Sequence, residues 1–325
     1  MLKHLLLGVL ALLASAAHAQ PTALRMKMFP GAQSLPVLAA VSQGFFERQG
    51  LKVEVLFTVN SQEQRDGLAS GDFQIAQAAV DNAVAMVEMA KQDVVIVTGG
   101  DSSMNEFFVQ PDVTAYADMK GQVLLVDAPD TAYALQLKKI MLNNGLKEGV
   151  DYKIYPIGGT GLRLKGLKEN KAYKGAMLNP PFSIDAAAAG LKSMGRAVEL
   201  IGPYQAQGTF VLRGWAKANR DVLERYIAAF IEGTRWTLDP KNRGAAVRIL
   251  SERLKVAPAV AARTYELMTD PKFGLAPDGR FDMQGFRSVL ALRAEIEGSW
   301  GGKPPPPDKY VDLSYYDGAI RRLSR

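Results

Sequence analysis

Residues 24–57, LRMKMFPGAQSLPVLAAVSQGFFERQGLKVEVLF, place a strand, a helix and a second strand in direct succession. Leu24–Phe29 and Lys52–Phe57 are mainly apolar runs of strand length. Between them, Pro36–Gln49 carries apolar residues at helical spacing and ends at Gly50. A helix that joins two strands is typical of an α/β fold with mostly parallel sheets.

The alternation of strands and helices continues through the first two thirds of the chain. Further strands are predicted at Phe73–Ala76, Val94–Thr98, Gln122–Val126, Tyr152–Ile157, Gly175–Leu178 and Thr209–Leu212. Ser61 with Gln64 has the form of a capping box, and Asp81 is predicted to cap a helix over Asn82–Lys91. After Asn219 the pattern is helical only, over 221–238, 243–254, 258–269, 282–297 and 313–323. The expected fold is therefore α/β, with flanking helices and a helical C-terminal tail.

The first nineteen residues have the form of a secretion signal. Lys3 supplies the positive charge, Leu5–Ala16 is the apolar segment, and Ala17-His18-Ala19 is a small-x-small cleavage site. We expect export to the periplasm and cleavage after Ala19. The rest of the sequence contains no apolar stretch near the roughly 20 residues that a membrane span needs.

Composition excludes several kinds of chemistry. Both histidines, His4 and His18, lie in the signal segment, and the chain has no cysteine. The exported protein therefore lacks the commonest general base, thiolate nucleophiles and most zinc ligands, so we expect no cofactor and no metal site. The net charge is +6, and the basic residues are scattered among acidic ones. This distribution does not favour nucleic-acid binding. Binding of a small molecule is favoured over catalysis.

A secreted hydrolase is the alternative from another class. The nucleophile elbow Gly-x-Ser-x-Gly is absent, and no histidine remains after the signal for a catalytic triad. A Ser–Lys dyad or a pair of carboxylates stays open, although no spacing in the sequence indicates one.

Four stretches resemble one family. They are residues 35–54 (LPVLAAVSQGFFERQGLKVE), 67–76 (GLASGDFQIA), 119–123 (MKGQV) and 310–316 (YVDLSYY). In this order they resemble ABC-transporter solute-binding proteins of the nitrate, sulfonate, taurine and thiamine-precursor group, the NMT1/THI5-like family. Gln74 departs from the family pattern, which usually has Asp there. A cytosolic pyrimidine-synthesising relative is disfavoured, because it needs a histidine and a cysteine-rich motif.

The resemblance implies a periplasmic binding protein of type II, with two lobes joined by a pair of crossover strands. Lobe I would comprise residues 20–111 and 207–325, and lobe II residues 112–206. The ligand would be a small anionic or heteroaromatic solute held between the lobes. The implied partner is the permease of an inner-membrane ABC transporter, and the protein would act as a monomer.

The ligand site is expected at the strand-to-helix turns. In open α/β sheets, ligands lie at the carboxyl ends of strands, where helix N-termini favour anions. The candidates at these turns are Ser34, Asn60, Ser61, Asp81, Asn82 and Asn105 before residue 112, and Thr131, Tyr133, Thr160, Asn179 and Phe182 after it.

Each of these candidates also has a structural interpretation. Ser61, Asp81 and Thr160 are good helix caps, and Tyr133 and Phe182 are either core aromatics or walls of a slot. Asp81 could accept a hydrogen bond from an amine or an aminopyrimidine. Two arginines, Arg163 and Arg213, could grip an anion or could be ordinary surface residues.

Overall fold

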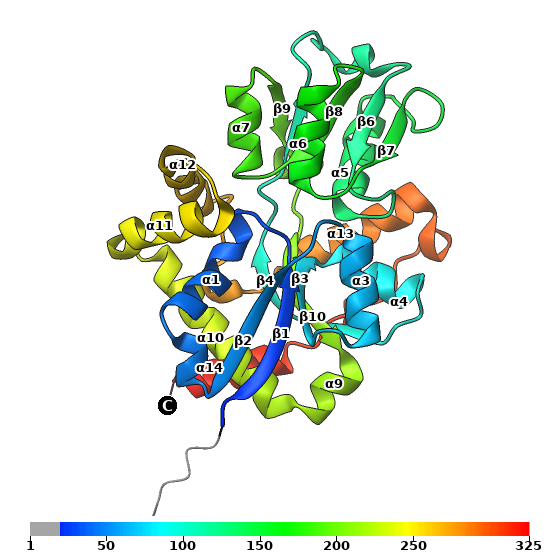
Figure 1. The fold of residues 1–325 in the computed structure, drawn as a ribbon. Helices are drawn as coiled ribbons and strands as arrows, with labels where there is room; N and C mark the ends of the chain where they lie inside the picture. Colours follow the sequence, from blue (N-terminus) through cyan, green and yellow to red (C-terminus); the bar gives the residue numbers. More distant parts are fainter. Residues whose placement is uncertain (1–19, 325) are drawn as a thin grey trace, which may run out of the picture.

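The computed structural model describes residues 20–324, which form two lobes, each built on a five-stranded sheet (Figure 1). The predicted signal peptide, residues 1–19, lies outside the described residues. Lobe I holds a sheet of strand order β2-β1-β3-β10-β4, and lobe II a sheet of order β7-β6-β8-β5-β9. Among residues 20–324, no helix is both long and apolar enough to cross a membrane.

The sheet of lobe I combines four strands that precede lobe II in the sequence with one strand that follows it. Its strands are β1 (Thr22–Met28), β2 (Leu51–Phe57), β3 (Ile75–Ala79), β4 (Val94–Asp101) and β10 (Gln207–Leu212). β1 pairs in parallel with β2 and β3, whereas β10 runs antiparallel to β3 and β4. The helix-linked strands that open the sequence are therefore parallel neighbours, as predicted.

The sheet of lobe II repeats this arrangement. Its strands are β5 (Glu106–Val109), β6 (Val123–Val126), β7 (Lys153–Pro156), β8 (Tyr173–Leu178) and β9 (Lys192–Arg196). β6 pairs in parallel with β7 and β8, and β5 runs antiparallel to β8 and β9. The eight predicted strands are all present, but β5 and β9 were not predicted.

Each sheet is mostly parallel, as predicted, but contains one strand that runs against the others, for one topological reason. The antiparallel strand is the first strand after the chain crosses between lobes: β5 on entering lobe II and β10 on returning to lobe I. The outward crossover lies between Asp101 and Glu106, so the lobe boundary predicted between residues 111 and 112 is several residues too late. On the return, β10 begins at Gln207, the first residue of the second predicted lobe I segment.

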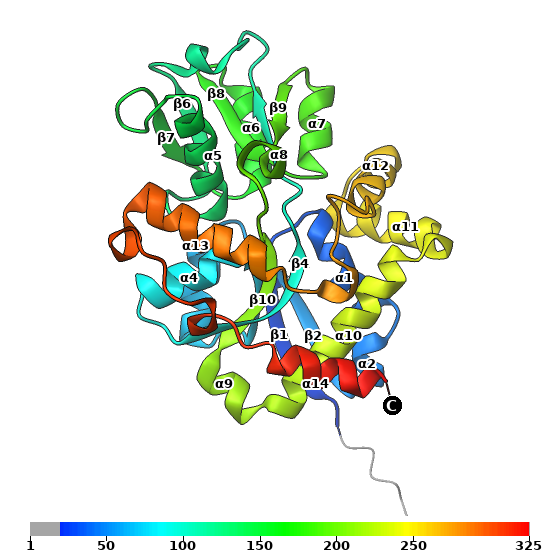
Figure 2. The same ribbon diagram turned by 180° about the vertical axis from the view of Figure 1, so that it is seen from behind.

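The helices of lobe I include the whole C-terminal tail. They are α1 (Leu35–Ser42), α2 (Phe45–Arg48), α3 (Ser61–Ser70), α4 (Asp81–Glu88), α9 (Arg213–Ala218), α10 (Arg220–Leu238), α11 (Arg243–Leu254), α12 (Pro258–Met268), α13 (Met283–Glu297) and α14 (Ser314–Leu323). Lobe II contributes α5 (Ala132–Asn143), α6 (Thr160–Glu169), α7 (Phe182–Ala188) and α8 (Ala197–Ile201). Figure 2 shows α13 beside α5 of lobe II and α14 across the far end of lobe I.

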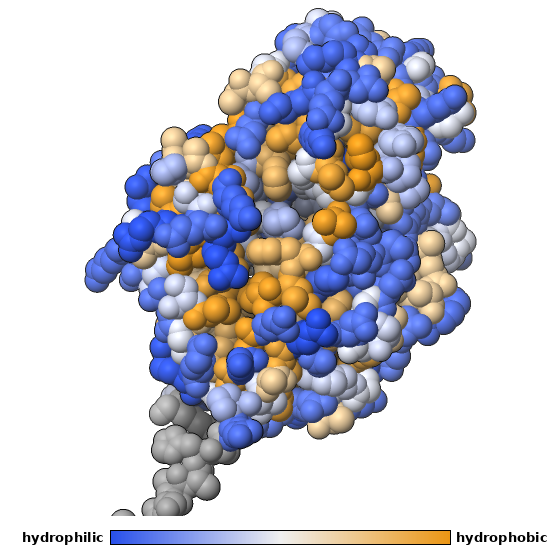
Figure 3. All heavy atoms as spheres, viewed as in Figure 1, coloured by the Kyte–Doolittle hydropathy of each residue, from blue (hydrophilic) through white to orange (hydrophobic). Residues whose placement is uncertain are grey.

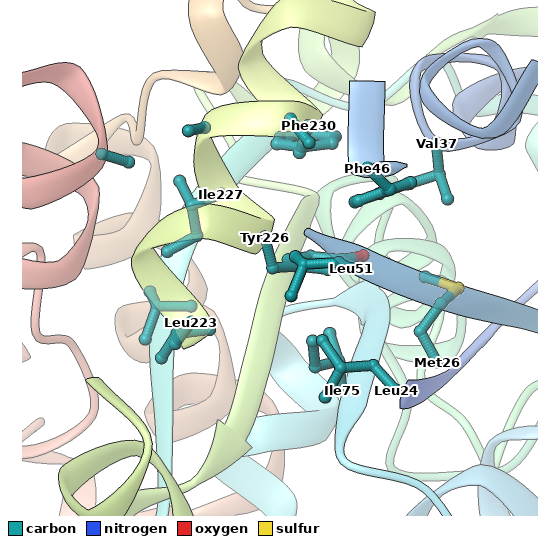
Figure 4. Packing of buried hydrophobic residues seen from close by; sticks show 14 of the residues in the cluster. Leu24, Met26, Val37, Phe46, Leu51, Ile75, Leu223, Tyr226, Ile227 and Phe230 are labelled. Carbon is teal, nitrogen blue, oxygen red and sulfur yellow. The ribbon is translucent and has the colours of Figure 1, made fainter. Parts of the chain in front are cut away.

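The tail helices stabilise lobe I because they cover a sheet made much earlier in the chain. Met26 and Ile75 from the sheet share one buried cluster with Tyr226 and Phe230 of α10 (Figure 4). The ring of Tyr226 also stacks on Phe46 of α2, with ring centroids 5.1 Å apart. Burial of such side chains is worth about 1.5–3 kcal/mol each, so the tail and the first sheet fold as one unit.

Three predicted helix starts or spans are wrong, each for a local reason. The helix predicted over Pro36–Gln49 is split, because Gly44 adopts a positive φ of 69° between α1 and α2. The cap of α3 is Asn60, whose side chain accepts from the Glu63 amide, so Ser61 is the first helical residue and not the cap. Asp81 likewise lies inside α4 and makes no capping hydrogen bond.

Gly233 provides a test of the contact between α1 and α10. A Cβ at Gly233 would lie 2.2 Å from the carbonyl oxygen of Pro36, whereas a Cβ at Gly244 in α11 meets nothing within 4 Å. Overpacking of this kind costs about 1–3 kcal/mol. We expect Gly233→Ala to lower the thermal unfolding midpoint and Gly244→Ala to leave it unchanged or raise it. Equal midpoints for the two variants would show that the helices do not make this close approach.

Candidate functional site

A cavity lies between the lobes, where the strand ends of the two sheets face each other. β1, β3 and β4 end at it from lobe I, and β6 and β8 end at it from lobe II. Its lining residues are Phe29, Gln33, Ser61, Ala78, Ala79, Asn82, Asp101, Met104, Asn105, Thr131, Ala132, Tyr133, Gln136, Asn179, Ala206 and Gln207. The cavity volume is about 40 Å³, which corresponds to roughly three water molecules. In this closed arrangement it suits a ligand of a few heavy atoms.

The structure brings more than half of the predicted site residues together around this cavity. Ser61 and Asn82 reach it from the first turns of α3 and α4, and Asn105 from the outward crossover. Thr131, Tyr133 and Asn179 reach it from the turns that precede or begin α5 and α7. The strand-to-helix turns therefore do converge, as the α/β topology predicts.

Five predicted residues do not line the cavity. Ser34 is buried and donates to the carbonyl oxygen of Gly31 at 2.7 Å, and Asn60 caps α3. Thr160 and Phe182 line a second, outer hollow of about 210 Å³, which shares Phe29 with the cavity. Figure 3 shows apolar residues on both lobes along their junction. Asp81 is the fifth.

Asp81 is held by an arginine of the C-terminal tail. Its two carboxylate oxygens accept from Arg293, with Nη2–Oδ2 at 2.7 Å and Nε–Oδ1 at 3.2 Å. Both side chains are almost fully buried. Burial alone would lower the pKa of Arg293, but the carboxylates of Asp81 and Glu297 hold that pKa above its ordinary value. Asp81 is therefore a structural ion-pair partner, and the prediction that it caps α4 or meets a ligand amine is wrong.

The two lobes are closed on each other by direct hydrogen bonds. Arg65 of α3 pairs with Asp130 of lobe II at 2.6 Å, and the Asp130 carbonyl accepts from Arg293 at 2.7 Å. Ser61 donates to Asp127 across the junction, and Asn179 donates to Gln33 Oε1 at 3.0 Å. Backbone bonds also cross the junction, from residue 159 to 59 and from 32 to 180. Opening the lobes would break all of these contacts together.

Neither arginine predicted as an anion grip is available to a ligand. Arg163 is fully buried and donates to Gly158 O, Met177 O and Thr160 Oγ1, while its guanidinium lies 4.6 Å from the ring centroid of Tyr133. Arg213 lies elsewhere in lobe I, bonded to Asp93 and to the carbonyl of Lys309.

Asp101 is the functional candidate that sequence analysis missed. It is the last residue of β4, lines the cavity and is 5% exposed. Its Oδ1 accepts from the Ser103 amide at 2.8 Å, and within residues 20–324 it has no ion-pair partner. Burial raises its pKa from 3.8 to about 6. The only signal in the sequence is a carboxylate directly after the apolar strand VVIVTGG, at the end where ligands bind.

The family of the chain follows from a match over most of its length. The model of the family described as NMT1/THI5 like matches residues 32–242. The chain belongs to the NMT1/THI5-like family. The family predicted from the four sequence stretches is thereby confirmed, whereas no curated protein matches the chain significantly.

Solved structures confirm the two-lobe binding-protein fold for this NMT1/THI5-like chain. A protein from Bordetella bronchiseptica RB50 superposes with a TM-score of 0.82 at 17% identity, covering 94% of this chain and 99% of that one. The periplasmic nitrate-binding protein NrtA from Synechocystis PCC 6803 gives 0.76 at 14% identity, with 93% and 89% covered. The alkanesulfonate-binding protein SsuA from Xanthomonas axonopodis pv. citri, bound to MOPS, gives 0.70 at 16% identity, with 88% and 96% covered.

The charges around the cavity determine which kind of ligand this family member can bind there. Among residues 20–324, no lysine or arginine lines the cavity, and no group of three or more metal-binding side chains could hold a metal ion. The N-termini of α4 and α5 favour an anion by about 0.3–1 kcal/mol each. An anion 4 Å from ionised Asp101 would be repelled by about 4 kcal/mol at an effective dielectric constant of 20. The carboxylate outweighs the helix ends.

The ion pair of Asp81 predicts a large loss of stability when one partner is removed. Asp81→Ala leaves Arg293 buried without its main partner, and we expect the free energy of unfolding to fall by about 3 kcal/mol or more. The double variant Asp81→Ala/Arg293→Met should recover much of this loss, because the fully buried charge is then removed and only the partly exposed Glu297 loses a partner. Urea unfolding of the three proteins measures both effects. An Asp81→Ala variant as stable as wild type would exclude the pair as a stabilising contact.

Removal of the Asp101 charge is expected to stabilise the protein, in contrast to removal of Asp81, and to do so only in a defined pH range. Because its pKa in the folded protein, about 6, lies above the ordinary 3.8, the folded state binds the proton more tightly. The cost of its buried charge is present above pH 6 and disappears as the pH falls towards 4. We expect Asp101→Asn to be more stable than wild type by on the order of 1–3 kcal/mol at pH 7.5, and equally stable at pH 4.

Urea unfolding of wild type and Asp101→Asn at the two pH values measures this difference. Asp93→Asn is the matched control, because the Asp93 side chain is 73% exposed, and it should show no pH-dependent gain. A loss of stability in Asp101→Asn at pH 7.5 would show that the buried charge is compensated within the fold.

Proposed function

We propose that this protein is the solute-binding component of an ABC importer, which captures one small molecule between its lobes and presents the closed form to a membrane permease. The cavity carries this proposal, because polar groups from both lobes line it at the converging strand ends. A ligand that contacts both lobes binds the closed state better than the open one, and this difference in affinity shifts the population towards closure. A closed surface then reports that the protein is loaded.

Family and relatives support this role. NMT1/THI5-like membership covers residues 32–242, and the solved relatives of the same fold include a nitrate-binding and an alkanesulfonate-binding protein. One of these is described as periplasmic, which agrees with the signal segment read from residues 1–19. We propose that the protein acts in the periplasm after cleavage behind Ala19, and that it acts there as a monomer.

The hydrolase alternative is not favoured by the site. The chain after residue 19 contains neither histidine nor cysteine. Ser61 and Asp127 form a hydrogen-bonded serine–carboxylate pair, but they lie on opposite lobes and separate whenever the cleft opens. A pair that also fastens the two lobes together is better explained as part of the closure contact.

Closure predicts a specific effect of the Arg65–Asp130 bridge. Thermal-shift screening against alkanesulfonates, nitrate, aromatic carboxylates and aminopyrimidines identifies a stabilising compound. We expect Arg65→Met to lower the affinity for that compound at least about tenfold, because truncating one partner of a largely buried bridge costs about 2 kcal/mol or more in the closed state. Calorimetry measures the affinity, and small-angle scattering measures compaction on binding.

The matched control is Arg48→Met, which breaks the ion pair with Glu232 inside lobe I at 3.1 Å. This control should keep both the affinity and the compaction of wild type. If no compound of the panel stabilises the protein, or a bound compound leaves the scattering radius unchanged, the importer role is contradicted.

A further inference from the structure

The cavity presents an uncompensated carboxylate to whatever it binds. Asp101 Oδ1 accepts one hydrogen bond from a backbone amide, and Oδ2 accepts none from residues 20–324. The side chain is 95% withdrawn from solvent, yet it lines the cavity. A buried carboxylate without a cation is costly for folding alone, so its natural complement is a positively charged or N–H-donating group of a ligand.

A second carboxylate approaches the same cavity from lobe II. Asp127 follows β6 and accepts from Ser61, a lining residue, through Oδ2, while its Oδ1 is buried without a partner. The buried guanidinium on this side is Arg163, which donates to two carbonyl oxygens and a threonine hydroxyl and whose charge interacts with that of Asp127. The charge of Arg163 therefore offsets Asp127, whereas among residues 20–324 no lysine or arginine lines the cavity beside Asp101.

The remaining polar groups and the walls are compatible with a flat ligand rich in N–H groups. Asn179 donates through Nδ2 to Gln33, which leaves its Oδ1 buried without a partner, and the side-chain oxygen of Asn82 is likewise buried without a partner among residues 20–324. Phe29 from lobe I and Tyr133 from lobe II supply aromatic walls. Burial raises the pKa of Tyr133 to about 12, so its hydroxyl stays neutral and adds no second negative charge beside Asp101. Side-chain amides can pair with either a donor or an acceptor on the ligand. The Asp101 carboxylate therefore determines which kind of ligand the cavity favours.

We propose that this cavity binds a small planar ligand with an amidinium-type edge, meaning N–H donors on two nitrogens bonded to the same carbon, as in amidinium, guanidinium and ring-protonated aminopyrimidine groups, and that Asp101 selects it over an oxyanion of the same size. This inference rests on the proposed solute-binding function. Of the two ligand classes expected from the sequence, it selects the heteroaromatic or cationic one, because a carboxylate and neighbouring N–H donors form strong, directed hydrogen bonds.

Two pairs of probes of equal shape and opposite charge test the inference on the mature chain. Guanidinium chloride is compared with sodium nitrate, and acetamidinium chloride with sodium acetate, each to 10 mM at pH 7.5 and constant ionic strength. We expect both cations to raise the thermal unfolding midpoint and to bind in calorimetry, and neither anion to do so. An anion that stabilises the protein more than its paired cation overturns the inference, as does the absence of any shift with both cations.

Asp101→Asn identifies the group responsible. It keeps the shape of the side chain, and its unliganded unfolding midpoint, at or above that of wild type, shows that it folds. We expect this variant to bind both cations at least tenfold more weakly than wild type. Asp93→Asn, which changes an exposed carboxylate on the same lobe, should leave the affinity for both cations unchanged. Unaltered cation binding in Asp101→Asn overturns the assignment. An anion that binds and compacts the protein would refute this inference and leave the solute-binding function standing.

Discussion

One buried guanidinium ties the architecture together. Arg293 of α13 pairs with Asp81 at the start of α4 and with Glu297, one turn further along α13. It also donates to the backbone carbonyl of Asp130 in lobe II. A charge with 1% of its side chain exposed must find all its partners within the protein, since leaving one buried charge unpaired costs several kcal/mol. The C-terminal tail, the first lobe and the wall of the cleft are thereby held in one register.

That register places α4 so that Asp81 points away from the cavity while Asn82, the next residue, lines it. On the other side of the cleft, Asp130 is held by Arg65. The charges around the cleft thus divide into two sets. One set is neutralised inside the protein and fastens the lobes, and the other, centred on Asp101, is the one that we propose a ligand neutralises. On this proposal, loading and closure are coupled because the same narrow junction carries both.

Much of the fold was predictable from local patterns. All eight predicted strands exist, because a short apolar run between polar turns has few alternatives in a chain of this size. The two missed strands, β5 and β9, are short, and Lys192–Arg196 contains two basic residues and a glycine. Their pairing comes from the crossovers, which no local pattern encodes. The turn residues that converge on the cavity were predictable as a group, since carboxyl ends of parallel strands meet at one edge.

Asp81 and Asp101 show where that kind of prediction stops. The order of residues is sufficient for the α/β pattern, the helical tail, the lack of histidine and cysteine after residue 19, and a set of polar turns. In sequence, both aspartates follow an apolar strand and look alike. Their roles separate only on folding, because Arg293, 212 residues from Asp81, neutralises one of them, and no cation within residues 20–324 reaches the other. Contacts between such distant residues follow from how the lobes pack, and that packing determines which carboxylate is neutralised inside the protein and which one stays without a cationic partner at the cavity.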